Sequence, residues 1–207
     1  MVGHQKIFSV LGNRKTVFMR KEHDFYPTPF SIVGLMVKEF MNRQDVSCKA
    51  LDIWEPCAGD KRIAEAIKSY AVVTEKTHSI GKRYMVGNVH CTDIQEGQDF
   101  FSYKEALLPN IMTNPPFKDI REFIDHAFEI GVEKMALISG ERLWACKKGR
   151  EQFERHKPDL FCMMDFREDY LGKGGSPDRA LAINIWDSPC ADSCEFKILR
   201  KPVEGKE

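Results

Sequence analysis

Two patterns of apolar residues alternate along this chain of 207 residues. In one, apolar residues recur every three to four positions, which predicts amphipathic helices; in the other, short continuous apolar runs have the length of buried strands. The helical pattern covers residues 29–41, 63–70, 120–128 and, with a more charged composition, 141–156. The strand-like runs cover residues 50–54, 89–94, 110–113, 134–139, 160–166, 180–186 and 195–200.

This alternation predicts an α/β domain in which helices cover both faces of a mostly parallel, seven-stranded sheet. The last strands follow one another without a helix between them, so the final strand is expected to run antiparallel. The first helix is expected to start at Thr28 and Pro29, with the threonine hydroxyl as its cap and the proline in the first helical position. Residues 71–85 are polar and irregular, which predicts a loop or an extension of the preceding helix.

The composition fits one domain with a substantial core and no overall charge. Apolar residues make up 43% of the chain, and Lys+Arg and Asp+Glu both number 31. Any phosphate-binding face must therefore be a local patch. Residues 1–22 form a basic arm, which is either a solvated terminus or a contact to phosphate. No apolar run approaches the roughly 18–20 residues that span a bilayer, and the first 18 residues lack a signal-peptide core.

The seven cysteines are scattered and form no CxxC pair. Structural zinc sites need ligands at closer and repeated spacing, so we expect no metal. Unpaired cysteines in a chain without a signal peptide predict reduced thiols and a cytoplasmic location.

Three turns with chemical potential follow three of the predicted strands, at residues 55–60, 93–99 and 114–117. In open α/β sheets, ligands bind at the carboxyl ends of the strands. We therefore expect these turns to lie at one edge of the sheet and to form a common site there.

The most informative turn is Asn114-Pro115-Pro116-Phe117. Two prolines remove two backbone donors, so the turn presents carbonyl groups. The Asn114 carboxamide and the Pro115 carbonyl each offer an acceptor, and the Phe117 ring offers a flat apolar surface for stacking. This combination suits a planar group with an exocyclic NH2. The competing interpretation is a purely structural Pro-Pro turn.

Three other features are weak when each is taken alone. The glycine turn at Glu55–Asp60 is common in α/β proteins. The aromatic and proline cluster at residues 24–29 is also explained as a hydrophobic staple on the first helix. Asp93, after the second strand, is placed to bind a ribose, with Asp99-Phe100 shortly after it, but acidic residues are common on protein surfaces.

In order and spacing, these features together resemble the S-adenosylmethionine-dependent amino-methyltransferases, and most closely the small phage and prophage DNA N6-adenine methyltransferases. The resemblance runs from about residue 24 to 187. It implies the Rossmann-like fold of class I methyltransferases, S-adenosylmethionine as cofactor and DNA as partner. The implied catalytic residues are Asn114, Pro115, Pro116 and Phe117. The implied cofactor-binding residues are Phe25, Tyr26, Pro27, Thr28, Glu55, Pro56, Cys57, Ala58, Gly59, Asp60, Asp93, Ile94, Asp99 and Phe100.

The implied reaction is direct methyl transfer to the N6 amine of adenine, catalysed by a site-specific DNA methyltransferase in the cytoplasm of a bacterium or a phage-infected host. Duplex DNA would have to expose the base by flipping it out. Residues 23–207 leave no room for a separate target-recognition domain. Cys57 precedes the Asn-Pro-Pro-Phe turn and lies in the cofactor motif, so it is not expected to be a nucleophile.

The sequence departs from the family at Lys61, where a second glycine is usual. Its Cβ would crowd the cofactor, or its ammonium would reach the cofactor carboxylate. Lys61 therefore leaves open an inactive methyltransferase-fold module that binds nucleic acid or a partner. A methyltransferase that modifies adenine N6 or guanine N2 of RNA also stays open, because some ribosomal RNA methyltransferases share the Asn-Pro-Pro motif. The sequence does not give the oligomeric state.

Overall fold

The computed structural model describes residues 28–44, 50–76, 86–167 and 180–202. The basic arm, Phe25, Tyr26, Pro27 and the glycine-rich segment 171–178 lie outside the described residues. The strands are β1 (Leu51–Glu55), β2 (Val86–Cys91), β3 (Asn110–Thr113), β4 (Lys134–Gly140), β5 (Leu160–Met164), β6 (Leu181–Trp186) and β7 (Glu195–Leu199). The helices are α1 (Phe30–Asn42), α2 (Arg62–Lys76), α3 (Ile120–Glu129) and α4 (Lys147–Arg155), with two short 3₁₀ turns, η2 (Ile94–Glu96) and η3 (Phe100–Ser102).

The seven strands form one sheet in the order β2-β1-β3-β4-β6-β5-β7. Strands β2, β1, β3 and β4 are parallel neighbours. Strand β6 is antiparallel to both β4 and β5, whereas β7 pairs in parallel with β5. The mostly parallel sheet is therefore confirmed. The antiparallel strand is the last but one in the chain, because the segment after β6 crosses back and lays β7 alongside β5.

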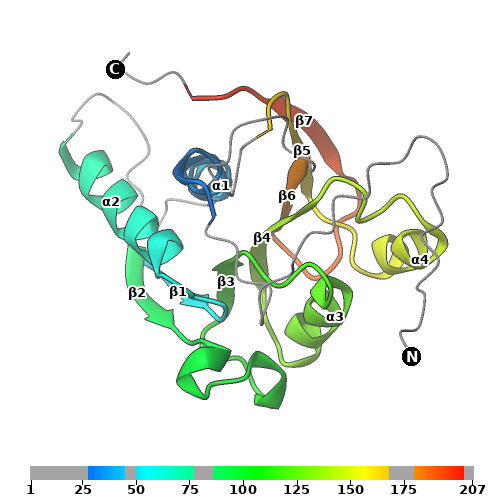
Figure 1. The fold of residues 1–207 in the computed structure, drawn as a ribbon, viewed down its shortest axis with the longest axis horizontal. Helices are drawn as coiled ribbons and strands as arrows, with labels where there is room; N and C mark the ends of the chain where they lie inside the picture. Colours follow the sequence, from blue (N-terminus) through cyan, green and yellow to red (C-terminus); the bar gives the residue numbers. More distant parts are fainter. Residues whose placement is uncertain (1–27, 45–49, 77–85, 168–179, 203–207) are drawn as a thin grey trace, which may run out of the picture.

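Helices cover both faces of this sheet (Figure 1). On one face, α1 and α2 bury residues such as Phe40 and Ile67 against the sheet, together with Ile53 of β1 and Ile183 of β6. On the other face, α3 buries Phe123 and its neighbours in a second cluster. Apolar residues therefore point to both sides of the central strands, as expected for a sheet buried on two faces.

The start of α1 differs from the prediction. Its N-cap is Pro29, and no side chain caps the helix. The Pro29 carbonyl accepts the amides of Ile32 and Val33, each at 3.1 Å. The predicted capping hydroxyl of Thr28 accepts a hydrogen bond from Asn114 instead. The Thr28 hydroxyl therefore bonds a residue 86 positions away in the sequence and does not cap the helix.

The predicted charged helix at 141–156 is shorter than expected, because α4 begins only at Lys147. Residues 141–146 form a loop instead. Trp144 donates its indole N–H to Asn184 Oδ1 at 2.8 Å, and Asn184 donates to Ser139 Oγ at 2.8 Å. These bonds hold the loop against β4 and β6, so it cannot follow a helical path.

The predicted turns do meet at one edge of the sheet. The parallel strands β1, β2, β3 and β4 all end there. Antiparallel β6 begins at the same edge, where Leu181 pairs with Gly140. No helix among the described residues has the length and apolar character needed to cross a membrane.

Candidate active site

Asn114 lies directly after β3, and its side chain has one partner and one open acceptor. Its Nδ2 donates to Thr28 Oγ1 at 2.8 Å. Its Oδ1 is buried and accepts no hydrogen bond from the described residues. A buried polar atom without a partner is rare in native proteins, because desolvation without compensation costs about 1–3 kcal/mol. This oxygen is therefore free to accept a hydrogen bond from a donor that is not among the described residues.

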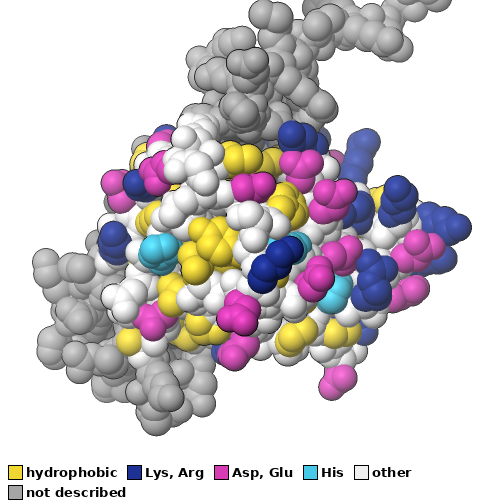
Figure 2. All heavy atoms as spheres, turned by 90° about the horizontal axis from the view of Figure 1, so that it is seen from below, with side chains coloured by type: hydrophobic (Ala, Val, Ile, Leu, Met, Phe, Trp, Pro, Cys, Tyr) yellow, Lys and Arg dark blue, Asp and Glu magenta, His cyan; other side chains and the backbone are white. Residues whose placement is uncertain are grey.

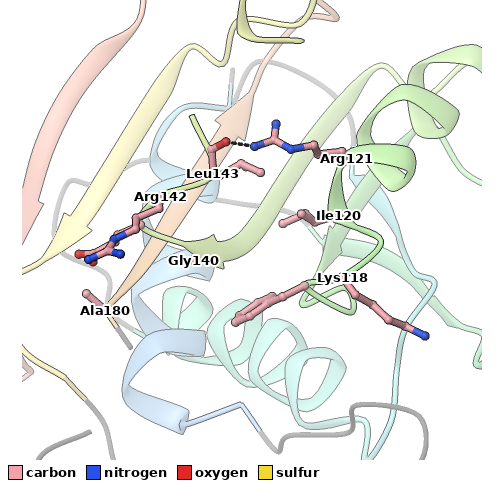
Figure 3. A pocket seen from close by; sticks show the side chains of 9 residues that line it. Lys118, Ile120, Arg121, Gly140, Arg142, Leu143 and Ala180 are labelled. Atoms are coloured by element: carbon pink, nitrogen blue, oxygen red, sulfur yellow. Dashed lines mark hydrogen bonds and ion pairs between the residues drawn. The ribbon is translucent and has the colours of Figure 1, made fainter. Parts of the chain in front are cut away.

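The rest of the Asn-Pro-Pro-Phe turn leads into a hollow of about 470 Å³. Pro115 is buried, and the Pro116 carbonyl accepts the Asp119 amide at 3.0 Å. Phe117 is half-buried and packs against the core under α1 and α2. The hollow is lined by Phe117, Lys118, Ile120, Arg121, Gly140, Glu141, Arg142, Leu143 and Ala180 (Figure 3). It joins the end of β3 to the end of β4 and the residue before β6.

The three cations of this hollow have different environments. The Arg121 guanidinium donates to the Leu143 carbonyl and to Gln152 Oε1 at 3.3 Å, so it fixes the wall of the hollow. Lys118 and Arg142 are more exposed, with side-chain exposures of 58% and 89%, and each lies 3.6 Å from the carboxylate of its chain neighbour, Asp119 or Glu141. Figure 3 shows Arg121 turned toward Leu143 and Lys118 extended away from it. Arg121 therefore has a structural task, whereas Lys118 and Arg142 are accessible to an anion.

The glycine turn after β1 contains two residues with left-handed backbone angles. Gly59 has φ 49° and Lys61 has φ 63°. Lys61 thus adopts a conformation that glycine takes without cost and that a residue with a Cβ seldom takes. Its Nζ lies 3.1 Å from Glu96 Oε1 of η2. The ammonium is therefore directed to the turn that follows β2.

Asp93 ties this glycine turn to the end of β2. Its Oδ2 accepts the Gly59 amide at 2.8 Å, and its Oδ1 accepts the Gln95 amide at 2.8 Å and caps η2. The Ala58 amide donates to the Thr92 carbonyl at 3.1 Å. A carboxylate has about four acceptor positions, so two amide donors leave Asp93 capacity for hydroxyl groups of a ligand.

Glu55 is a buried carboxyl at the end of β1, only 1% exposed. Its Oε2 accepts the Ala64 amide from the first turn of α2 at 3.0 Å and lies 3.7 Å from Cys91 Sγ. Burial raises the pKa of Glu55 to about 8, against the opposing effect of the Ala64 amide. The carboxyl is therefore close to its titration point at neutral pH.

Asp99 and Phe100 lie at the start of η3, where Asp99 Oδ1 accepts the Phe101 amide at 3.1 Å. Phe100 is only 4% exposed and stacks on Phe123 with ring centroids 4.1 Å apart. Its neighbour Phe101 is 38% exposed and Ile94 is 56% exposed. Phe101, which the sequence analysis did not single out, is thus the more accessible aromatic ring of this pair.

The surface around η2 and η3 is mixed in charge. Figure 2 views the molecule from the side on which these turns lie, and apolar side chains there are surrounded by acidic and basic ones. Basic side chains gather toward the side of α4, where acidic ones are interspersed with them. The described residues of this face therefore form no continuous basic field.

Cys57 has the environment of a packed thiol. Burial raises its pKa to about 12, and the nearby Asp93 carboxylate acts in the same direction. A thiol with this pKa is protonated at neutral pH and is a poor nucleophile. All cysteines among the described residues are free.

The chain is similar in fold to several solved structures. No family model matches the chain, and no curated protein matches it. The methyltransferase subunit of a type I restriction-modification system from Streptococcus thermophilus gives a TM-score of 0.53 at 12% identity, over 84% of this chain and 47% of that chain. The M protein of the type I restriction enzyme EcoKI gives a TM-score of 0.50 at 12% identity, over 87% of this chain and 50% of that chain.

A candidate class I S-adenosylmethionine-dependent methyltransferase from Listeria monocytogenes gives a TM-score of 0.50 at 9% identity, over 91% of this chain and 68% of that chain. At such identities the likeness concerns the fold. The seven-stranded sheet with one antiparallel strand is the Rossmann-like fold of class I methyltransferases. The chain spans about half the length of the two restriction-modification structures.

Proposed function

We propose that this protein is an S-adenosylmethionine-dependent methyltransferase that transfers a methyl group directly to the N6 amine of adenine in DNA. One observation carries the proposal: the buried, unpartnered Oδ1 of Asn114, in a turn whose last residue lines a hollow. The free Asn114 Oδ1 can accept a hydrogen bond from an N–H group of the substrate. The fold and the restriction-modification methyltransferases among the similar structures support the proposal.

The residues at the ends of β1 and β2 fit a cofactor that carries a nucleoside. Asp93 has acceptor capacity for ribose hydroxyls, and the exposed side chains of Ile94 and Phe101 offer apolar surface to an adenine ring. The Gly59 amide donates to Asp93, Glu55 ends β1 and Asp99 caps η3. When bound, S-adenosylmethionine supplies an electrophilic methyl group on a sulfonium.

On the acceptor side, the task of the protein is orientation. The N6 lone pair of adenine is delocalised into the ring, which makes the amine a poor nucleophile. Hydrogen bonds from the amine to Asn114 Oδ1 and to the Pro115 carbonyl hold both hydrogens and direct the lone pair out of the ring plane. Positioning and fixed dipoles of this kind are major sources of rate enhancement.

The hollow beside Phe117 supplies the surface for the base. Phe117 offers a ring for stacking, a contact worth about 1–3 kcal/mol per base. Lys118 and Arg142 are accessible to the phosphates of the strand that carries the base. A base in duplex DNA must be flipped out of the stack to enter such a site.

The test is transfer of labelled methyl groups from S-adenosylmethionine to unmethylated DNA, with ribosomal RNA and protein extract as parallel acceptors. We expect labelled DNA that yields N6-methyladenine on digestion. Asn114→Ala should abolish transfer and leave cofactor affinity within about twofold, because the lost contact is to the acceptor. Asn88→Ala is the matched control, since Asn88 is exposed on β2.

Two outcomes would contradict the proposal. Labelling of RNA alone would move the substrate class to RNA. Cofactor binding without labelling of any acceptor, or no binding at all, would favour a binding module with the methyltransferase fold.

A further inference from the structure

Thr28 is hydrogen-bonded to the acceptor asparagine, Asn114. Its Oγ1 accepts the hydrogen bond of Asn114 Nδ2 at 2.8 Å, and the residue is only 5% exposed. With Nδ2 engaged in this way, the other end of the carboxamide, Oδ1, is the end without a partner. One hydrogen bond therefore separates the donor and acceptor ends of Asn114.

Thr28 is itself held from two sides. Arg62 Nη1 donates to the Thr28 carbonyl at 2.8 Å, and the same guanidinium lies 4.8 Å from the centroid of the Phe30 ring and pairs with Asp60. Pro29 follows with φ −58° and caps α1 through its carbonyl. Because the backbone is fixed on both sides, the Thr28 hydroxyl has a defined position relative to Asn114.

The carboxamide needs such a partner. The terminal χ2 torsion of asparagine has a broad energy profile and no sharp staggered minima, so packing alone does not fix the plane of the amide. Removal of the Thr28 hydroxyl would leave Nδ2 without its acceptor and allow the plane to rotate. Oδ1 would then move away from the line on which it receives the amine.

We propose that Thr28 is a positioning residue that sets the plane of the Asn114 carboxamide and so the direction of the amine acceptor. The proposal rests on the proposed function for its catalytic consequence. It assigns Thr28 to the acceptor side of the reaction, whereas the family resemblance places this residue with the cofactor.

The kinetic test compares Thr28→Val, which keeps the shape and loses the hydroxyl, with Thr28→Ser, which keeps the hydroxyl. We expect Thr28→Val to lower kcat by about 10- to 100-fold, the size of effect that a small misplacement of a reacting group produces. The Kd for S-adenosylmethionine, measured by calorimetry, should stay within about twofold, and Thr28→Ser should recover kcat to within about threefold.

Two kinetic results would overturn the proposal. An unchanged kcat with a weakened cofactor Kd in Thr28→Val would place the hydroxyl on the cofactor. An equal loss of kcat in Thr28→Ser and Thr28→Val would show that the hydroxyl is not the group that matters.

A spectroscopic test separates this proposal from the proposed function. In protein labelled with ¹⁵N-asparagine, the side-chain amide of Asn114 is assigned by its disappearance in Asn114→Ala. Its hydrogen-bonded proton should move upfield in Thr28→Val and keep its position in Thr28→Ser, while the other amide signals report an intact fold. An unchanged signal in Thr28→Val would refute the positioning role, even if the wild-type protein transfers no methyl group.

Discussion

Lys61 and Glu96 form an ion pair, with Nζ and Oε1 3.1 Å apart, that joins the residue before α2 to the 3₁₀ turn after β2. Both side chains are about half exposed, and solvent-exposed pairs of this kind contribute little to stability. Lys61 also has φ 63°. Left-handed backbone of this kind costs a residue with a Cβ about 1–2 kcal/mol. The backbone cost thus equals or exceeds the benefit of the ion pair.

Lys61→Gly should therefore stabilise the fold, because glycine removes the cost of the left-handed backbone and the ion pair that is lost contributes little. Lys61→Ala is the matched control, because it loses the ion pair and keeps the strained backbone. Urea unfolding at low salt should rank Gly above wild type and Ala below it. A glycine variant that is less stable than the alanine variant would show that Lys61 is not strained.

Glu55 should make the stability of the protein depend on pH. Burial raises its folded-state pKa to about 8, whereas an unfolded chain has a Glu pKa near 4.3. Between these values the folded state holds more protons than the unfolded state, so the free energy of unfolding falls as pH rises and levels off above about pH 8. Glu55→Gln, which cannot ionise, should lack this decline.

Urea unfolding of wild type and Glu55→Gln at pH 5 and pH 8.5 measures the effect. From pH 5 to pH 8.5, the free energy of unfolding of Glu55→Gln should rise relative to that of the wild type by up to about 4 kcal/mol. Comparison of the two proteins cancels the other titrating groups. A constant difference between them at both pH values would mean that the Glu55 carboxyl ionises normally.

Asn184 should be among the side chains on which stability depends most. It lies in the centre of β6, is 0% exposed, and joins Trp144 Nε1 to Ser139 Oγ. Asn184→Leu has a similar size but removes the acceptor of the half-buried Trp144 indole N–H and the donor to Ser139 Oγ, which keeps only its bond to the Gly140 carbonyl at 3.2 Å. The loss of such a buried hydrogen-bond network costs about 1–3 kcal/mol per unsatisfied group.

We expect Asn184→Leu to lower the free energy of unfolding by about 2–4 kcal/mol, measured by urea denaturation. Asn88→Ala, at an exposed position of β2, should change it by less than about 0.5 kcal/mol. Similar effects of the two substitutions would mean that the Trp144–Asn184–Ser139 network contributes little.

Thiol alkylation should distinguish packed cysteines from accessible ones. Burial raises the pKa of both Cys57 and Cys162 to about 12, whereas Cys146 and Cys190 are exposed. Iodoacetamide at pH 8.5 should modify Cys146 and Cys190 first, and the other two only after unfolding, because the thiolate is the reactive form. Peptide mass spectrometry follows each site. Rapid modification of Cys57 in the folded protein would contradict its interpretation as a packed, unreactive thiol.

The sequence was sufficient for most of the fold because the apolar patterns are regular. Strand β3 has its predicted bounds, and α3 ends one residue beyond its predicted end. The parallel order brings the three predicted turns to one edge, since strands joined by helices must run in the same direction.

The remaining differences arise from contacts between residues that are distant in the sequence. Thr28 is a good local cap by residue type, but its hydroxyl meets Asn114 across the fold. Phe100 and Phe101 are identical neighbours, and only the packing of Phe100 on Phe123 shows which ring is buried. The sequence of the loop before α4 predicts a helix, and only the hydrogen bond from Trp144 to Asn184 shows why the segment is a loop. No local pattern contains these contacts.

The 86 positions between Thr28 and Asn114 affect how such proteins are recognised in genome data. The Asn-Pro-Pro-Phe motif contains the asparagine whose Oδ1 is the proposed acceptor, whereas the hydroxyl that binds its Nδ2 belongs to Thr28, before the first strand. A truncated gene that begins after Thr28 would keep those letters and encode an asparagine with no partner for its amide. A search pattern that also requires a Thr-Pro pair upstream of the first strand would separate intact sites from such remnants.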